Sequence, residues 1–457
     1  MQCSYFNSDL IAKYAMTGPR YTSYPTAVEF NDKYSEKERI ADLIASNNTN
    51  RDLSLYIHIP FCEHVCYYCA CNKIITKNHT QSDEYLKYLK KELTLQLKYI
   101  DSKKRKLQQL HFGGGTPTFL SKDDYENIWQ FLKENFVLVE DGEYSIEIDP
   151  RTVNFDYLAH LRKLGFNRIS FGIQDFDEQV QKSINRVQSF ELVSQLVKQA
   201  RGLNYRSISM DLIYGLPHQN KNEFQETLQK IIKLSPDRLA VFNYAHLPDL
   251  FGAQKQIDAD LLPSKEEKLL ILEDTIKTLT NNNYEFIGLD HFAHRDDDLV
   301  KHQQQGTLYR NFQGYSTYSN CDVVACGISA ISQTFDSYCQ NHKARDKYYA
   351  SLDKDELPVS RGINLSQDDI IVRKIITEIM CNLQLDLDKI AADFNIDSAK
   401  YFQQEWQNLD ELAADGLIKK EGNKISILPP GRLLIRNIAM VFDKYLQAKK
   451  HKFSQVI

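Results

Sequence analysis

Between residues 53 and 281, short apolar runs alternate regularly with longer amphipathic stretches, and few folds accommodate such a pattern. The runs are rich in β-branched and aromatic residues, whereas the longer stretches repeat their apolar residues at helical spacing. Alternation of this kind predicts a parallel sheet with right-handed crossovers. The predicted strands are Leu53–Ile59, Leu107–Phe112, Tyr144–Ile148, Arg168–Phe171, Ser207–Ile213 and Arg238–Tyr244, and the predicted helices lie at about 81–100, 122–135, 154–164, 189–202, 222–233 and 264–281.

Six strand–helix units are too few for a closed eight-stranded barrel, but they suit an open, partial barrel. In such folds the chemistry collects at the carboxyl ends of the strands. Polar or glycine residues follow or close the predicted strands at the Cys62 loop, Gly113–Gly115, Glu147, Gln174, Asp211 and Asn243–His246. We therefore expect the functional site at this edge of the sheet.

The 457 residues suit a large catalytic domain with smaller additions. The predicted fold is α/β, with a partial (βα)6 barrel over residues 51–290. Residues 1–50 are polar and are expected to form an N-terminal extension over the active site. Composition changes after residue 290, so residues 291–365 are expected to extend the barrel with loops and short strands. Residues 366–457 are expected to form a mainly helical C-terminal domain, ending in a strand pair within Gly416–Ile427 and a final helix from Leu433.

Charge and hydropathy exclude several classes of protein. The net charge of −5 is unlike the basic field of a nucleic-acid binder. No apolar run approaches the ~20 residues that span a bilayer, and Met1–Phe6 lacks the charged-then-apolar order of a signal peptide. These features favour a cytoplasmic protein with no membrane or nucleic-acid partner. The absence of an obvious association helix favours a monomer.

Residues 366–430 could be mistaken for a winged-helix DNA-binding module, because helices, a glycine-containing turn and a short strand pair are predicted there. This region contains 12 acidic and 7 basic residues, a net charge of −5. That sign is wrong for binding phosphate. We interpret the region as a lid or wall over a substrate cavity.

Four of the nine cysteines fall within ten residues, and three of them, Cys62, Cys66 and Cys69, have the spacing C-x3-C-x2-C. Such a loop can turn three thiolates toward one iron–sulfur cubane and leave its fourth iron open. A structural zinc site normally needs a second, distant pair of ligands, which is not found here. A chance grouping of buried cysteines explains four in ten residues poorly. The spacing therefore favours a [4Fe–4S] cluster.

Cys71 allows two interpretations. As a fourth ligand it would close the cluster and make an electron-transfer site. It lies only two residues past Cys69, however, and could not readily reach the opposite corner of the same cubane. We interpret it as a neighbour of the active site. The lone histidines His64, His111 and His291 have no metal-ligand partners at helical spacing, and we assign them no role.

Several motifs carry a resemblance to a known family across nearly the whole chain. The extended cysteine motif, with Tyr67-Tyr68 before the third cysteine and Ala70–Lys73 after it, resembles that of the oxygen-independent coproporphyrinogen III oxidases of the radical SAM superfamily. One departure is Tyr68, where the family usually has Phe. The other matching segments are Gly18–Thr26 (GPRYTSYPT), His111–Thr118 (HFGGGTPT), Asp211–Pro217 (DLIYGLP), Phe242–Pro248 (FNYAHLP), Arg310–Gly314 (RNFQG) and Gly327–Ser332 (GISAIS).

The resemblance implies a [4Fe–4S] cluster and two molecules of S-adenosylmethionine (SAM). The positions that match the family's contacts to the SAM on the cluster are Tyr56, Gly114, Glu147 and Ile331. Those that match its contacts to the second SAM are Tyr68, Gly115, Thr116, Gln174, Arg186, Asp211 and Ala245. Taken singly, Gln174 and Arg186 would more often be surface or loop residues. A carboxylate such as Asp211 among apolar neighbours, however, needs a partner.

The resemblance also implies the reaction, in which a SAM-derived 5′-deoxyadenosyl radical starts the oxidative decarboxylation of two propionates of coproporphyrinogen III, giving protoporphyrinogen IX. Because the substrate has four carboxylates, we expect cationic and aromatic contacts near it. The candidates are Arg20, Tyr21 and Arg310. A surface charge packed beside loop aromatics explains these residues as well as a substrate contact does.

Two other functions fit the same frame, a radical SAM haem chaperone and a radical SAM methyltransferase. Chaperone relatives lack the fourth cysteine and the Gly18–Thr26 segment, and both are present here. The sequence does not name the electron donor, the electron acceptor or the order in which the two propionates react.

Overall fold

The computed structural model describes residues 5–448 in two compact units. The larger unit comprises residues 30–282 and 320–364, and the smaller comprises residues 1–29, 283–319 and 365–457. The first four residues of the predicted N-terminal extension, Cys3 included, and the last nine of the predicted C-terminal domain lie outside the described residues. Across residues 5–448, no helix has the length and apolar character needed to cross a membrane.

The larger unit is built on a curved, mainly parallel sheet. Six neighbouring strands run parallel in the order β1-β4-β5-β6-β7-β8, which confirms the six predicted strands. They are β1 (Asp52–Ile59), β4 (Lys106–Gly114), β5 (Val137–Ile148), β6 (Arg168–Gln174), β7 (Ser207–Tyr214) and β8 (Arg238–Asn243). The sheet continues beyond β1 through β13 (Cys321–Cys326), β14 (Ile331–Gln333), β15 (Ser337–Asn341) and β16 (Val359–Asn364). β13 pairs in parallel with β1 on the side away from β4, and it was not predicted as part of the barrel.

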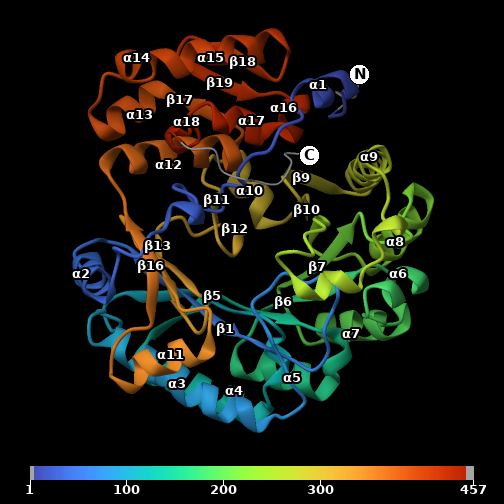
Figure 1. The fold of residues 1–457 in the computed structure, drawn as a ribbon, viewed down its shortest axis with the longest axis vertical. Coiled ribbons are helices and arrows are strands. Elements are labelled where there is room, and N and C mark those ends of the chain that lie inside the picture. Colours follow the sequence, from blue (N-terminus) through green and yellow to red (C-terminus); the bar gives the residue numbers. More distant parts are fainter. Residues whose placement is uncertain (1–4, 449–457) are drawn as a thin grey trace. The chain divides into compact units, whose positions relative to one another are not determined.

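Helices connect the parallel strands and lie around their outer side (Figure 1). The six predicted helices are present as α3 (Thr80–Leu97), α4 (Lys122–Asn135), α5 (Phe155–Leu164), α7 (Phe190–Gly202), α8 (Lys221–Leu234) and α9 (Lys265–Asn281). Side chains such as Ser121, Asn154 and Ser264 accept hydrogen bonds from first-turn amides and fix where three of these helices begin. The unit also contains α2 (Glu36–Ser46), α6 (Glu178–Ser183), α11 (Arg345–Asp353), β2 (Phe61–Cys62) and β3 (Ile74–Ile75).

Alternation along the strands separates the core from the functional face. On β7, Met210 and Leu212 are fully buried, whereas Asp211 between them is only half-buried. Glu147 on β5 is likewise flanked by the buried Ile146 and Ile148. Since successive side chains of a strand point to opposite faces, both carboxylates point away from the apolar face. The same sequence pattern that forms the core therefore presents acidic groups on the other side of the sheet.

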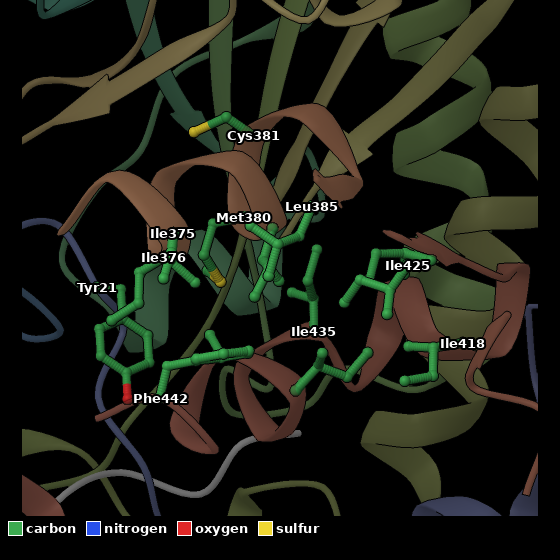
Figure 2. Packing of buried hydrophobic residues seen from close by; sticks show 14 of the residues in the cluster. Tyr21, Ile375, Ile376, Met380, Cys381, Leu385, Ile418, Ile425, Ile435 and Phe442 are labelled. Carbon is green, nitrogen blue, oxygen red and sulfur yellow. The ribbon is translucent and has the colours of Figure 1, made fainter. Parts of the chain in front are cut away.

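The smaller unit has a helical core of its own. Figure 2 shows α12 (Gln367–Asn382) contributing Ile375, Ile376 and Met380 to a cluster that also contains Ile435. Its other elements are α1 (Ser8–Lys13), β9 (Tyr284–Gly288), β10 (His291–His294), α10 (Asp298–Gln304), β11 (Tyr309–Asn311), β12 (Gly314–Ser316), β17 (Gln384–Asp386), α13 (Leu387–Phe394), α14 (Ser398–Tyr401), α15 (Gln403–Ala414), β18 (Ile418–Glu421), β19 (Lys424–Ile427), α16 (Pro429–Leu433), α17 (Ile435–Met440) and α18 (Lys444–Ala448). The predicted strand pair is present as β18 and β19. A single final helix from Leu433 was wrong, because non-helical residues 441–443 separate α17 from α18.

Within the larger unit, a buried carboxylate on α3 holds the segment that follows β13. The Glu92 side chain is 1% exposed. It accepts hydrogen bonds from the Gly327 amide at 2.8 Å, Asn341 Nδ2 at 2.7 Å, Tyr348 Oη at 2.6 Å and Gln96 Nε2 at 3.2 Å. Burial raises the pKa of Glu92 to about 7, although these donors favour the charged form.

This pKa predicts a loss of stability as the pH rises. An acid whose pKa is higher in the folded protein binds more protons when folded, so its contribution to stability is full below its unfolded pKa and is lost as the pH rises toward the folded value. From pH 5 to pH 8, wild type should lose on the order of 2 kcal/mol relative to Glu92→Gln in chemical denaturation. The exposed Glu84→Gln on the same helix is the matched control. A wild-type minus Glu92→Gln difference that is constant over this range would contradict the prediction.

Candidate active site

The three predicted cluster ligands lie in one loop of the larger unit. Cys62 ends β2, and Cys66 and Cys69 follow it; Cys62 and Cys66 are buried, whereas Cys69 is half-buried. The loop is fixed by contacts outside itself, because the Tyr67 amide donates to the Ile184 carbonyl at 3.0 Å and Thr116 Oγ1 donates to Cys62 Sγ at 3.3 Å. The thiols are thus held at the carboxyl end of the sheet, where the site was expected.

Cys71 lies beside a predicted ligand. A side-chain hydrogen bond from Cys71 lowers the pKa of the Cys69 thiol to about 6. Burial opposes this shift, and the charge of Lys73 adds to it. The thiolate is the form that binds metal. Among residues 5–448, no three His, Cys, Asp or Glu side chains converge closely enough to enclose one metal ion. Cubane clusters differ from such sites because each thiolate binds a separate iron atom.

Two arginines approach the loop. Arg186 Nη1 lies 3.6 Å and Arg151 Nη2 lies 3.9 Å from Cys66 Sγ. Both are paired with Asp149, at 3.1 Å and 2.7 Å respectively. Burial alone would raise the pKa of Asp149, but the two arginine charges lower it to about 2. Positive charge at this position favours thiolate and an anionic cluster. Sequence reasoning missed Asp149 and Arg151, although they directly follow the predicted strand Tyr144–Ile148.

The glycine run Gly113–Gly115 ends β4 and packs against the residues that precede the cysteine loop. Gly114 has φ +118°, and a Cβ there would lie 2.6 Å from the His58 ring. A Cβ on Gly115 would lie 2.6 Å from the Pro60 carbonyl oxygen. Only glycine allows β4 to pack this closely against β1 and β2. The Gly114 amide is directed at Glu147, whose Oε2 accepts it at 3.1 Å.

His111 also contacts Glu147. Its Nε2 lies 3.3 Å from Glu147 Oε1, and its Nδ1 lies 2.6 Å from Ser145 Oγ. Burial alone would raise the pKa of Glu147, but the hydrogen bond and charge of His111 and the Gly114 amide hold it below its usual value. Tyr56 stacks on the His111 ring with centroids 5.8 Å apart. Sequence reasoning assigned His111 no role, and the structure places its ring against Glu147, which is a predicted SAM contact.

The residues predicted to hold a second SAM include polar groups that lack protein partners. Gln174 has φ +65° and donates Nε2 to Tyr68 Oη at 2.7 Å, while its buried Oε1 has no hydrogen-bond partner among the described residues. Arg186 Nε is also buried and unpartnered within residues 5–448. Burial, and then the charge of Glu147, raise the pKa of Asp211 to about 7. The unpaired Gln174 Oε1 and the Asp211 carboxyl suit a donor or cationic group of a ligand, whereas the unpaired Arg186 N–H suits an acceptor group of the same ligand.

The remaining predicted contacts lie at ends of strands in the same unit. Thr116 follows β4, Ala245 follows β8 and Ile331 begins β14. Ala245 is exposed, and the other two are half-buried.

The three candidate substrate residues lie in the smaller unit. Arg20 forms an ion pair with Asp290, and Arg310 Nη1 donates to the Arg20 carbonyl oxygen at 2.6 Å. Tyr21 is 5% exposed and lies in the helical core shown in Figure 2, with its hydroxyl donated to Asp443 at 2.8 Å. The structure therefore brings Arg20 and Arg310 together and gives Tyr21 a packing role, while the prediction that these residues contact substrate stays a prediction.

Comparison with known proteins identifies the family of this chain. Residues 56–231 match the model of the radical SAM superfamily, and residues 365–434 match that of the HemN C-terminal domain. A Pseudomonas aeruginosa protein named oxygen-independent coproporphyrinogen III oxidase is 46% identical over 99% of both chains. The Escherichia coli protein of the same name is 46% identical over 98% of both chains.

Solved structures lead to the same family. The structure of coproporphyrinogen III oxidase (HemN) from Escherichia coli, described as a radical SAM enzyme, aligns with a TM-score of 0.92 and 43% identity. The alignment covers 97% of this chain and 100% of that one. These findings confirm the predicted partial barrel and the [4Fe–4S] and SAM cofactors. The chain belongs to the oxygen-independent coproporphyrinogen III oxidase family of radical SAM enzymes.

Proposed function

We propose that this chain catalyses the anaerobic oxidative decarboxylation of two propionate side chains of coproporphyrinogen III to vinyl groups, giving protoporphyrinogen IX. The observation that carries the proposal is 46% identity, over 99% of both chains, to a relative named for this reaction's substrate. The reaction belongs to haem biosynthesis. Cys71 and the Gly18–Thr26 segment favour it over the haem chaperone.

Cys62, Cys66 and Cys69 are proposed to hold the [4Fe–4S] cluster through their thiolates. When reduced and bound to SAM, the cluster would supply one electron that cleaves SAM into methionine and a 5′-deoxyadenosyl radical able to take a hydrogen atom from a propionate. The protein's own part is to hold three thiolates in a fixed loop and to place Arg151 and Arg186 near Cys66, where their charges stabilise negative charge on sulfur.

The SAM on the cluster is proposed to contact Tyr56, Gly114, Glu147 and Ile331. The orientation of Glu147 supports this assignment, since His111 and the Gly114 amide each hold one of its carboxylate oxygens. A carboxylate fixed in this way is a preorganised acceptor for an ammonium or hydroxyl group.

A second SAM is proposed to contact Tyr68, Gly115, Thr116, Gln174, Arg186, Asp211 and Ala245. The unpartnered Gln174 Oε1 and the raised pKa of Asp211 support this part of the proposal. A cationic ligand near Asp211 would favour its charged form and offset its burial.

The proposal extends to the setting of the enzyme. We expect a cytoplasmic monomer that binds coproporphyrinogen III through Arg20 and Arg310 and exchanges electrons with a donor and an acceptor still to be identified. The four segments 1–50, 51–290, 291–365 and 366–457 remain our proposed division of the chain.

An anaerobic assay tests the function directly. The reconstituted protein, supplied with coproporphyrinogen III, SAM and a reductant, should release a tricarboxylate intermediate and then protoporphyrinogen IX, detected after oxidation by chromatography. Neither should form when SAM is omitted. Absence of both products from the complete mixture would reject the proposal, and stable haem binding would favour the chaperone.

Single cysteine substitutions test the cluster ligands. Cys62→Ser, Cys66→Ser and Cys69→Ser should each lose most of the bound iron and all turnover, because each removes one of three thiolates. Cys71→Ser should keep its iron. Iron and sulfide content are measured on each reconstituted variant. Iron loss in Cys71→Ser equal to that in the other three would make Cys71 a ligand and contradict the assignment.

Gly114→Ala tests the glycine run separately from the cluster. The new Cβ would lie 2.6 Å from His58, at a φ that side chains rarely adopt, so the Gly114 amide must shift away from Glu147. We expect SAM affinity to fall about tenfold or more, measured by equilibrium binding, with iron content unchanged. Gly252→Ala is the matched control, because no atom lies within 4 Å of its added Cβ. Equal SAM affinity in the two variants would contradict the role of Gly114.

A further inference from the structure

Three arginines of the smaller unit meet around one short stretch of backbone. Arg436 donates its Nε to the Pro19 carbonyl oxygen at 2.8 Å and its Nη2 to that of Gly18. Arg310 donates Nη1 to the next carbonyl, that of Arg20, at 2.6 Å. Three consecutive carbonyl groups are thus held by two guanidinium groups, and the third arginine belongs to the stretch itself. We call Arg20, Arg310 and Arg436 the arginine cluster.

The arginine cluster has a positive local field. Burial first, and then the charges of Arg20 and Arg310, lower the pKa of the Arg436 guanidinium to about 10. Asp290 pairs with Arg20, yet this repulsion between the arginines persists. A field of this sign, made by partly buried guanidinium groups, favours an anion.

Arg310 retains capacity to bind such an anion. A guanidinium has five N–H donors. The Nε of Arg310 is buried and has no hydrogen-bond partner among residues 5–448. The Arg310 side chain also lies over the ring of Tyr315, 5.6 Å from its centroid, which fixes the direction of the fork. Arg436 is 3% exposed and donates from two of its nitrogens to backbone carbonyl groups, so it positions the cluster without contacting a ligand.

The chemistry of the substrate distinguishes two kinds of carboxylate, if the proposed function is right. Each reacting propionate loses one hydrogen atom, one electron and CO2, and leaves a vinyl group. The hydrogen atom goes to the deoxyadenosyl radical and the electron to a one-electron acceptor. The other two propionates keep their charge throughout. A guanidinium bound to a reacting carboxylate would stabilise a charge that disappears during the reaction, and would therefore raise the barrier. Bound to a carboxylate that survives, it contributes affinity at no such cost.

We propose that Arg20 and Arg310, positioned by Arg436, bind the two propionates of coproporphyrinogen III that do not react. The inference rests on the proposed function and assigns the arginine cluster to one half of the substrate. The cluster then anchors substrate, intermediate and product alike, since all three keep these two carboxylates.

Two stable porphyrins separate the alternatives in binding assays on the whole protein. Coproporphyrin III carries all four propionates, whereas mesoporphyrin IX carries only the two that survive, with ethyl groups at the reacting positions. Fluorescence titration should show that Arg310→Gln and Arg20→Gln each lose about tenfold in affinity for both porphyrins. Arg310→Lys should lose less, because it keeps the charge but not the fork. Arg295→Gln, which breaks an exposed ion pair with Glu285 in the same unit, should change neither affinity.

Each other outcome overturns the inference. Affinity lost for coproporphyrin III alone would place the arginine cluster on the reacting propionates. Unchanged affinity of the variants for both porphyrins, or no binding of either porphyrin to wild type, would show that the arginine cluster binds no carboxylate. Iron content and circular dichroism of each variant check that it is folded. The turnover assay of wild type tests the proposed function separately: an inactive wild type with the expected porphyrin binding would reject the decarboxylation and keep the carboxylate site.

Discussion

Parallel pairing of neighbouring strands is the constraint on which the site depends. Ile59 of β1 lies opposite Gly114 of β4, and Asp211 of β7 lies opposite Gly172 of β6. This register brings the ends of all six strands to one edge of the sheet. Groups more than a hundred residues apart in sequence, from the cysteine loop to Asp211, therefore lie at the same edge of the sheet. The hydrogen bond from the Gly114 amide to Glu147 joins two of these strands where they end.

Much of the larger unit could be predicted because its signals are local. Hydrophobic periodicity located the six neighbouring parallel strands β1, β4, β5, β6, β7 and β8, and the cysteine spacing singled out the Cys62–Cys69 loop that follows β2. β5 was predicted too short, since it begins at Val137 and its first residues include Glu140 and Asp141, which do not alternate with apolar residues. β13 was not predicted because its six residues are all buried and do not alternate with polar residues. Its place beside β1 is set by pairing with a strand more than 250 residues away in sequence.

The roles of individual polar residues were less accessible. His111 lies in a predicted strand and Arg151 follows another, but only the folded sheet brings them to Glu147 and Cys66. Tyr21 shows the converse, because an aromatic residue next to an arginine in a turn-rich segment suits a ligand contact or a core equally well. Its burial in the helical core depends on residues from distant parts of the chain.

The two units carry charges that suit two different ligands. SAM has a sulfonium and an ammonium group, and the proposed function assigns to it the carboxylates Glu147 and Asp211 at the strand ends of the larger unit. Asp211, with a pKa of about 7, is costly to charge until a cation approaches, so an anionic substrate gains little there. The smaller unit presents the opposite field through Arg20, Arg310 and Arg436. If the two proposals hold, the cofactor's cationic groups and the substrate's surviving carboxylates use different side chains and do not compete for them.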